Sequence, residues 1–155
     1  MQLSRESQYA LEGLSVLAEQ PRGKVMLLRE IAKVRHLPPG FLAKIFQKLT
    51  RHKVVSAHRG AIRGYSLARL PHEISLRAIL EAVEGSDVFE RCIFWAGGCS
   101  DQKPCRLHHM WAMVRPKVQE MMERTTLEEI VSGGVGGLSL GGQRRECVPW
   151  TKERA

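Results

Sequence analysis

The sequence predicts a mainly α-helical fold with one small β-hairpin, and three observations support this prediction. Apolar residues recur at helical spacing through most of residues 4–125. Two short runs of strand-favouring residues, 54–58 and 65–67, lie close together in the first half of the chain. Near the end the composition changes, because six of the eleven residues 132–142 are glycine. We therefore expect a folded unit followed by a flexible tail.

Three helices are expected before the hairpin. Residues 4–19 form the first, with Ser4 as its N-cap, and residues 28–35 form the second. The third spans about 39–52, because a proline suits the first helical position. Its apolar face consists of Leu42, Ile45, Phe46 and Leu49, and its polar face of Lys44, Gln47, Lys48 and Arg51.

The segments after these helices complete the pattern. Three helices followed by a hairpin are typical of a winged helix-turn-helix. A fourth helix is expected over 75–84, and residues 86–103 lack helical periodicity, which predicts a loop. A long helix over 104–125 follows, and Thr126 with Glu129 forms a capping box for a last short turn. The long helix carries an apolar stripe, wide enough to pack against another helix, made of Leu107, Trp111, Val114, Val118, Met121 and Met122.

Basic residues are concentrated in one part of the chain. The whole sequence has 24 Lys and Arg against 16 Asp and Glu, a net charge of +8. Residues 21–70 contain 12 of these bases and a single acid, a local net of +11, so the remaining residues carry a net −3. This excess favours double-stranded DNA as partner over a membrane surface, because no lysine-rich amphipathic helix with an aromatic face is present. No membrane-spanning run and no signal peptide is recognisable, so a soluble cytoplasmic protein is expected.

The winged helix-turn-helix order assigns roles to the basic residues. The third helix would enter the major groove, and the hairpin would lie along the backbone or in the minor groove. Gln47 has the amide geometry for adenine, and the basic side chains suit phosphates or guanine edges. The expected DNA-binding residues are Lys44, Gln47, Lys48 and Arg51 on the helix and Arg59 and Arg63 on the hairpin.

Three of the four cysteines cluster shortly before the long helix. Cys92, Cys99 and Cys105 are followed by His108, three residues after the last of them. Thiolates are soft ligands suited to iron-sulfur clusters or zinc, and the two-residue cysteine spacing common in zinc sites is absent. With Cys105 in the first helical turn, the helix dipole would favour its thiolate, and His108 would share its face. We expect these four residues to ligate a metal centre and Cys147 to be uninvolved.

Together these features resemble the bacterial IscR/NsrR-type transcriptional regulators. The resemblance covers roughly residues 1–131, and the DNA-binding motifs and the cysteine loop occur together and in order. The matching motifs are Leu3-Ser4, Tyr9-Ala10-Leu11, Ile31-Ala32, Phe41 to Ile45, Arg59-Gly60, Gly64 to Ala68, the three cysteines and Thr126-Leu127.

The resemblance implies a homodimer on a near-palindromic DNA operator, with the long helices at the dimer interface and an iron-sulfur cluster near the cysteines. Cluster-biogenesis regulators of this kind have a histidine where this chain has His108, which implies a 2Fe-2S cluster ahead of 4Fe-4S. Nitric-oxide sensors of this kind instead use a carboxylate from the first helix of the partner subunit, and at the matching position this chain has Gln8, with Glu6 nearby. The implied organisation is a winged helix-turn-helix domain over 1–85, a cluster-binding loop over 86–103, a dimerisation helix over 104–131 and a flexible glycine-rich tail over 132–155.

The expected function is therefore a transcriptional regulator whose operator affinity is controlled by a cluster that senses redox state, iron or cluster supply, or nitric oxide. One alternative is a regulator of the same fold that uses zinc or cysteine thiol oxidation. A second is an electron-transfer protein that docks on an acidic partner. An enzyme is not expected, because the sequence has no phosphate-cradling loop, no pair of metal-binding histidines on a helix and no nucleophile with a base.

Overall fold

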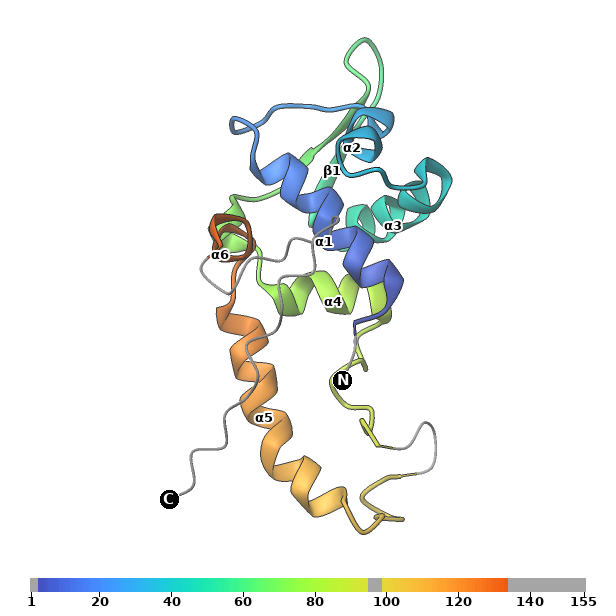
Figure 1. The fold of residues 1–155 in the computed structure, drawn as a ribbon, viewed down its shortest axis with the longest axis vertical. Helices are drawn as coiled ribbons and strands as arrows, with labels where there is room; N and C mark the ends of the chain where they lie inside the picture. The colour runs from blue at the N-terminus through green and yellow to red at the C-terminus, as the bar shows by residue number, and fades with distance from the viewer. Residues whose placement is uncertain (1–2, 95–98, 134–155) are drawn as a thin grey trace.

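The computed structural model describes residues 3–94 and 99–133 of the 155-residue chain. Figure 1 shows a compact winged-helix half at one end of the long axis and the cysteine loop at the other end. A long helix leads from that loop back to the winged-helix half. In the part of the chain that is described, no helix combines the length and the apolar character needed to cross a membrane.

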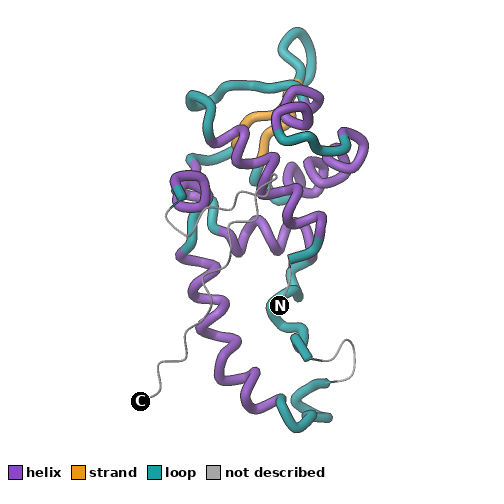
Figure 2. The backbone as a smooth tube through the Cα atoms, in the orientation of Figure 1, coloured by secondary structure: helices purple, strands orange, loops and turns teal. Residues whose placement is uncertain are grey.

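The elements follow the predicted order. The helices are α1 (Arg5–Ala18), α2 (Leu28–Val34), α3 (Pro39–Arg51), α4 (Leu76–Glu84), α5 (His108–Arg124) and α6 (Leu127–Ser132), with a short 3-10 turn, η1 (Pro71–Glu73). Strands β1 (Val55–His58) and β2 (Gly64–Leu67) pair in antiparallel register, with Val55 opposite Leu67, and form the orange hairpin of Figure 2. The prediction of a mainly helical winged helix-turn-helix is confirmed.

Local sequence signals begin several helices as expected. The Ser4 hydroxyl caps α1 by accepting a hydrogen bond from the backbone N–H of Ser7 at 3.2 Å. Pro39 occupies the first position of α3. Thr126 and Glu129 form the reciprocal capping box at the start of α6, with bonds of 2.9 and 3.3 Å.

The core of the winged-helix half forms around α1, which contacts α3, α4 and α6. The apolar face predicted for α3 is completely buried in it, as Leu42, Ile45, Phe46 and Leu49 show. Gly13 of α1 faces the Phe46 ring, and a Cβ at this position would lie 2.8 Å from a ring carbon. The missing side chain therefore allows α1 and α3 to pack closely.

The long helix begins later than the sequence predicted, at His108 instead of Pro104. No side chain caps its start at Leu107, and the backbone N–H of Cys105 is directed at the sulfur of Cys99, 3.4 Å away. The prediction that Cys105 lies in the first helical turn is wrong. Contacts within the cysteine loop set the position of Cys105 instead.

Residues 126–131, which the sequence grouped with the long helix, pack on the winged-helix half. Leu127 is fully buried, and its backbone N–H donates to the carbonyl of Ile74 at 2.9 Å. The N–H of Leu76 donates in turn to the carbonyl of Thr125 at 2.7 Å. The chain that leaves the core after α4 therefore returns to it through α6, as Figure 1 shows.

Candidate DNA-binding surface and metal centre

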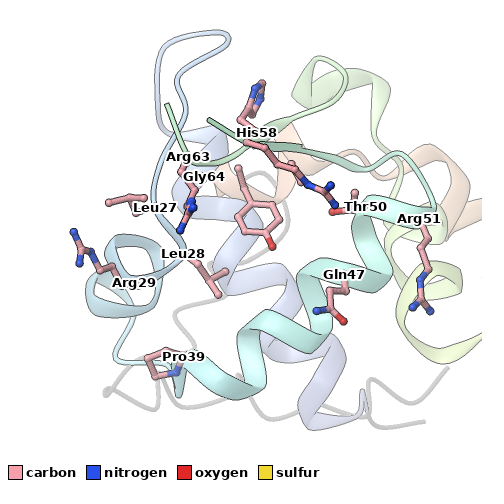
Figure 3. A pocket seen from close by; sticks show the side chains of 13 residues that line it. Leu27, Leu28, Arg29, Pro39, Gln47, Thr50, Arg51, His58, Arg63 and Gly64 are labelled. Carbon is pink, nitrogen blue, oxygen red and sulfur yellow. The ribbon is translucent and has the colours of Figure 1, made fainter. Parts of the chain in front are cut away.

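A groove of about 960 Å³ lies between α2, α3 and the hairpin. Figure 3 shows Gln47 and Arg51 on its α3 side, Arg29 on its α2 side and Arg63 on its hairpin side. Arg59 of the hairpin also lines it. The structure therefore brings together four of the six residues expected to bind DNA, along one concave and basic surface.

Close backbone contacts fix the hairpin beside α3. Met26 and Tyr65 exchange two backbone hydrogen bonds of 2.9 and 2.8 Å, and the Tyr65 ring meets the Phe46 ring edge-on with centroids 5.0 Å apart. Gly64 has a φ of +148°, and a Cβ there would collide with the carbonyl of Met26. A glycine is thus required at the point where the hairpin crosses the segment before α2.

The remaining two expected DNA-binding residues lie outside the groove lining. Lys44 is exposed on α3. Lys48 has its ammonium 2.6 Å from the Glu6 carboxylate of α1, and it donates to the carbonyl of Val83 in α4 at 3.0 Å. The ammonium of Lys48 therefore contacts two other helices of the same chain, and Lys48 does not line the groove beside Gln47 and Arg51.

Two groove residues have no counterpart among the expected DNA-binding residues. Arg29 is exposed in the first turn of α2, and His58 at the end of β1 lies 2.9 Å from the Ser66 hydroxyl across the hairpin. The sequence offers a signal for Arg29, since it is a base near the start of the helix that precedes the recognition helix α3. Its side chain lines the same groove as the hairpin, which pairs with Met26 just before α2.

The structure gathers the three cysteines of the loop between α4 and α5. The sulfurs of Cys92, Cys99 and Cys105 all lie within 4.8 Å of one another, and the three residues are partly buried. The backbone N–H of Cys105 lowers the pKa of the Cys99 thiol, but burial and the neighbouring sulfurs outweigh it and leave this pKa above its ordinary value. Three thiolates this close repel one another, and a cation among them removes that repulsion.

His108 joins this group through Cys99. Its Nδ1 lies 3.1 Å from the Cys99 sulfur, and its Nε2 lies 3.0 Å from a carboxylate oxygen of Asp101. The sequence expected His108 to share a helical face with Cys105, which fails because His108 is the first residue of α5. Three thiols and an imidazole form a donor set that fits an iron-sulfur cluster, and the same set fits zinc. Trp95 and Cys147 lie outside the described residues.

Ion pairs attach the start of the cysteine loop to both flanking helices. Glu90 accepts a hydrogen bond from Gln119 of α5 at 3.0 Å and forms an ion pair with Arg115 of the same helix at 3.2 Å. Arg91 donates to the carbonyl of Glu84, the last residue of α4, at 3.2 Å, and pairs with Asp87 at 2.7 Å. The hydrogen bond from Arg91 lowers the pKa of the Asp87 carboxyl. The start of this loop is therefore attached to the end of α4 and to the middle of α5.

A family model and a related protein both identify the family of this chain. A family model named Rrf2 and described as iron-dependent transcriptional regulator matches residues 3–133. IscR of Sodalis glossinidius is 30% identical over 133 residues, which cover 85% of this chain and 79% of that protein.

Solved structures agree with this family. CymR (YrzC), the global cysteine regulator of B. subtilis, superposes with a TM-score of 0.68 at 26% identity, over 85% of this chain and 97% of that one. IscR of T. potens superposes with a TM-score of 0.65 at 24% identity, over 86% and 88% of the two chains. Family and fold favour a regulator over the electron-transfer alternative. This chain belongs to the Rrf2 family and is a DNA-binding transcriptional regulator, not an enzyme.

Proposed function

We propose that this regulator is a homodimer whose affinity for a near-palindromic operator is controlled by an iron-sulfur cluster. Cys92, Cys99, Cys105 and His108 hold that cluster. The observation that carries the proposal is the convergence of three sulfurs within 4.8 Å, with an imidazole beside them, in a family described as iron-dependent. A 2Fe-2S cluster is favoured over 4Fe-4S, because histidine can replace cysteine on one iron of such a cluster. Such a regulator acts on DNA in the cytoplasm.

The dimer forms through the outward side of α5. Met110, Met113, Val114 and Met121 are 48–59% exposed, and their spacing puts them on one side of the helix. Trp111 is buried on the inward side. An exposed apolar stripe of this length on one long helix supports pairing with the same stripe of a second copy.

Each half of the operator receives one recognition surface. Gln47 and Arg51 of α3 contact base edges or phosphates in the major groove, and Lys44 extends that contact along the helix. Arg59 and Arg63 contact the backbone or the minor groove. This assignment is supported by the common groove that Gln47, Arg51, Arg59 and Arg63 line. A two-fold dimer then requires half-sites related by the same symmetry.

Contacts at the end of α4 couple the cysteine loop to the recognition helix. Arg91 of the loop donates to the carbonyl of Glu84, whose carboxylate accepts from the hydroxyls of Ser4 and Ser7. Lys48 of α3 donates to the carbonyl of Val83, one residue away. When bound, the cluster supplies a centre whose charge changes with redox state, which reacts with nitric oxide and which the protein can lose. When its ligands hold the cluster, the cysteine loop keeps the end of α4 in place. When the cluster is lost, the loop is released and no longer fixes the end of α4. A coupling of about 1–3 kcal/mol would change operator affinity about 5- to 150-fold.

A second candidate is a regulator of the same fold that binds zinc or oxidises its thiols. The same three sulfurs favour it, because Cys3His is a structural zinc set and thiols this close need little movement to form a disulfide. Metal content separates the two candidates.

Anaerobic purification with iron and sulfide analysis tests the proposal. We expect a coloured protein with both elements, loss of them in Cys99→Ser, and an altered visible spectrum in His108→Ala. His109→Ala is the matched control, because this exposed neighbour is not near the cysteines in any described contact, and its variant should keep the wild-type spectrum. A colourless wild-type protein with stoichiometric zinc would overturn the cluster.

A further inference from the structure

A tight turn between the second and third cysteines carries an acidic residue. The backbone N–H of Lys103 donates to the carbonyl of Ser100 at 3.0 Å and to its hydroxyl at 3.2 Å, and the N–H of Ser100 returns a bond of 3.4 Å to the Lys103 carbonyl. Asp101 lies within this turn, and one of its carboxylate oxygens is 3.0 Å from Nε2 of His108. The turn thus holds a carboxylate against the imidazole.

Both ring nitrogens of His108 have a partner, which defines how the ring is oriented. Nε2 faces Asp101, and Nδ1 faces the sulfur of Cys99 at 3.1 Å. A carboxylate can only accept a hydrogen bond, so this contact calls for a proton on Nε2, and in the neutral imidazole Nδ1 then carries the lone pair that faces the Cys99 sulfur. Nδ1 is therefore the nitrogen available to a metal.

We propose that Asp101 is a positioning residue for the metal centre, which orients His108 so that Nδ1 is the ligating atom. This role rests on the proposed function, since it requires His108 to be a ligand. A carboxylate that receives the remote N–H of a ligating histidine fixes the ring and makes the ligating nitrogen more basic. The Asp101 side chain is 90% exposed, so its contact with His108 contributes little to the stability of the fold itself.

The carboxylate of Asp101 accepts a hydrogen bond from Nε2 and also carries a negative charge, and substitutions can separate these two roles. Asp101→Asn keeps an oxygen that accepts from Nε2 but removes the negative charge, whereas Asp101→Ala removes both. Asp101→Glu keeps the charge on a longer side chain. Glu128→Gln is the control, because Glu128 is an exposed carboxylate on α6 that no described contact joins to the cysteine loop.

The test uses full-length protein purified anaerobically with its iron. In Asp101→Ala we expect iron loss to a chelator to be about 10- to 100-fold faster than in the wild type. The reduction potential should become more positive in both Asp101→Ala and Asp101→Asn, because an anion beside the centre is removed. Asp101→Glu should restore part of both properties, and Glu128→Gln should match the wild type.

Selective ¹⁵N labelling of histidine gives a readout that does not depend on activity. Electron-nuclear double resonance of the reduced wild type should show the larger hyperfine coupling from Nδ1 and the smaller from Nε2, with the Nδ1 coupling weakened in Asp101→Ala. Asp101 variants that share the wild-type potential, iron-loss rate and coupling would overturn this role while leaving the cluster intact. A wild type without iron, or with iron but without nitrogen coupling, would overturn it together with His108 as a ligand.

Discussion

Lys48 of α3 and Glu6 of α1 form an ion pair with 2.6 Å between Nζ and the carboxylate oxygen, and the same ammonium donates to the carbonyl of Val83. A base on the polar face of the recognition helix thus binds two other helices of its own chain. Its bond to Val83 lies one residue from Glu84, where the cysteine loop is attached through Arg91. Lys48 is therefore placed to transmit movement of that loop to α3.

Lys48→Met and Arg51→Met should separate transmission from DNA contact. In Lys48→Met we expect the salt dependence of operator binding to stay at the wild-type slope, while the affinity difference between iron-loaded and iron-free protein shrinks. In Arg51→Met the slope of log K against log salt should fall by about 1, since the variant cannot neutralise one of the phosphates. Binding titrations at several salt concentrations measure both quantities. A loss of slope in Lys48→Met equal to that in Arg51→Met would show that Lys48 contacts DNA.

The hairpin arginines should contribute mainly sequence-independent affinity. Arg59→Ala and Arg63→Ala are each expected to weaken binding to operator and to unrelated DNA, with a slope reduced by about 1 for each phosphate that is no longer neutralised. Arg124→Ala removes the same charge from an exposed site at the end of α5, where the side chain pairs with Glu120. Fluorescence anisotropy should show no change of slope in this control, and an equal change in all three variants would argue against a specific contact of the hairpin.

Gly64→Ala should destabilise the hairpin more than Gly60→Ala. Both glycines have positive φ, +148° and +98°, but only a Cβ at position 64 collides with the backbone of Met26. The backbone strain alone costs about 1–3 kcal/mol, and the collision adds to it at position 64. Urea unfolding of the two variants measures the difference in the free energy of unfolding. Equal losses would mean that the close approach to Met26 is readily relieved.

The exposed side of α5 should control the oligomeric state. Met113→Asp places a charge within the apolar stripe and should convert the dimer to a monomer. Glu123→Ala truncates a residue of the same helix that faces Arg77 of α4, away from that stripe, and should leave the dimer unchanged. Analytical ultracentrifugation distinguishes the two states, and a Met113→Asp variant that sediments as the wild type would place the dimer interface elsewhere.

The winged-helix half could be predicted because its signals are local. The proline at the start of α3, the four apolar residues on its inner face and the capping serine of α1 each act within a few residues, and the structure has all of them. The order of the elements then identified the fold. The clustering of the cysteines was predicted from their spacing in the chain.

The features that could not be predicted depend on contacts between distant residues. The partners of Lys48 lie 42 and 35 residues away in the chain, so its position on α3 could not indicate that its ammonium contacts Glu6 and Val83. The chain before α5 is a loop in which the amide of Cys105 is directed at the sulfur of Cys99, six residues earlier, and α5 begins only at His108. The approach of Asp101 to His108 depends on the turn that closes between Ser100 and Lys103.

Operator affinity measured anaerobically with iron-loaded and iron-stripped wild type tests the central claim most directly. Both forms are titrated with the same operator at one salt concentration, with Cys99→Ser as a protein that cannot be reloaded. We predict that the operator affinities of the two wild-type forms differ about 5- to 150-fold. Reloading the stripped protein with iron should restore the affinity of the iron-loaded form, and Cys99→Ser should keep the affinity of the iron-free form under all conditions. Equal affinities of iron-loaded and iron-stripped protein would contradict control of DNA binding by the metal centre.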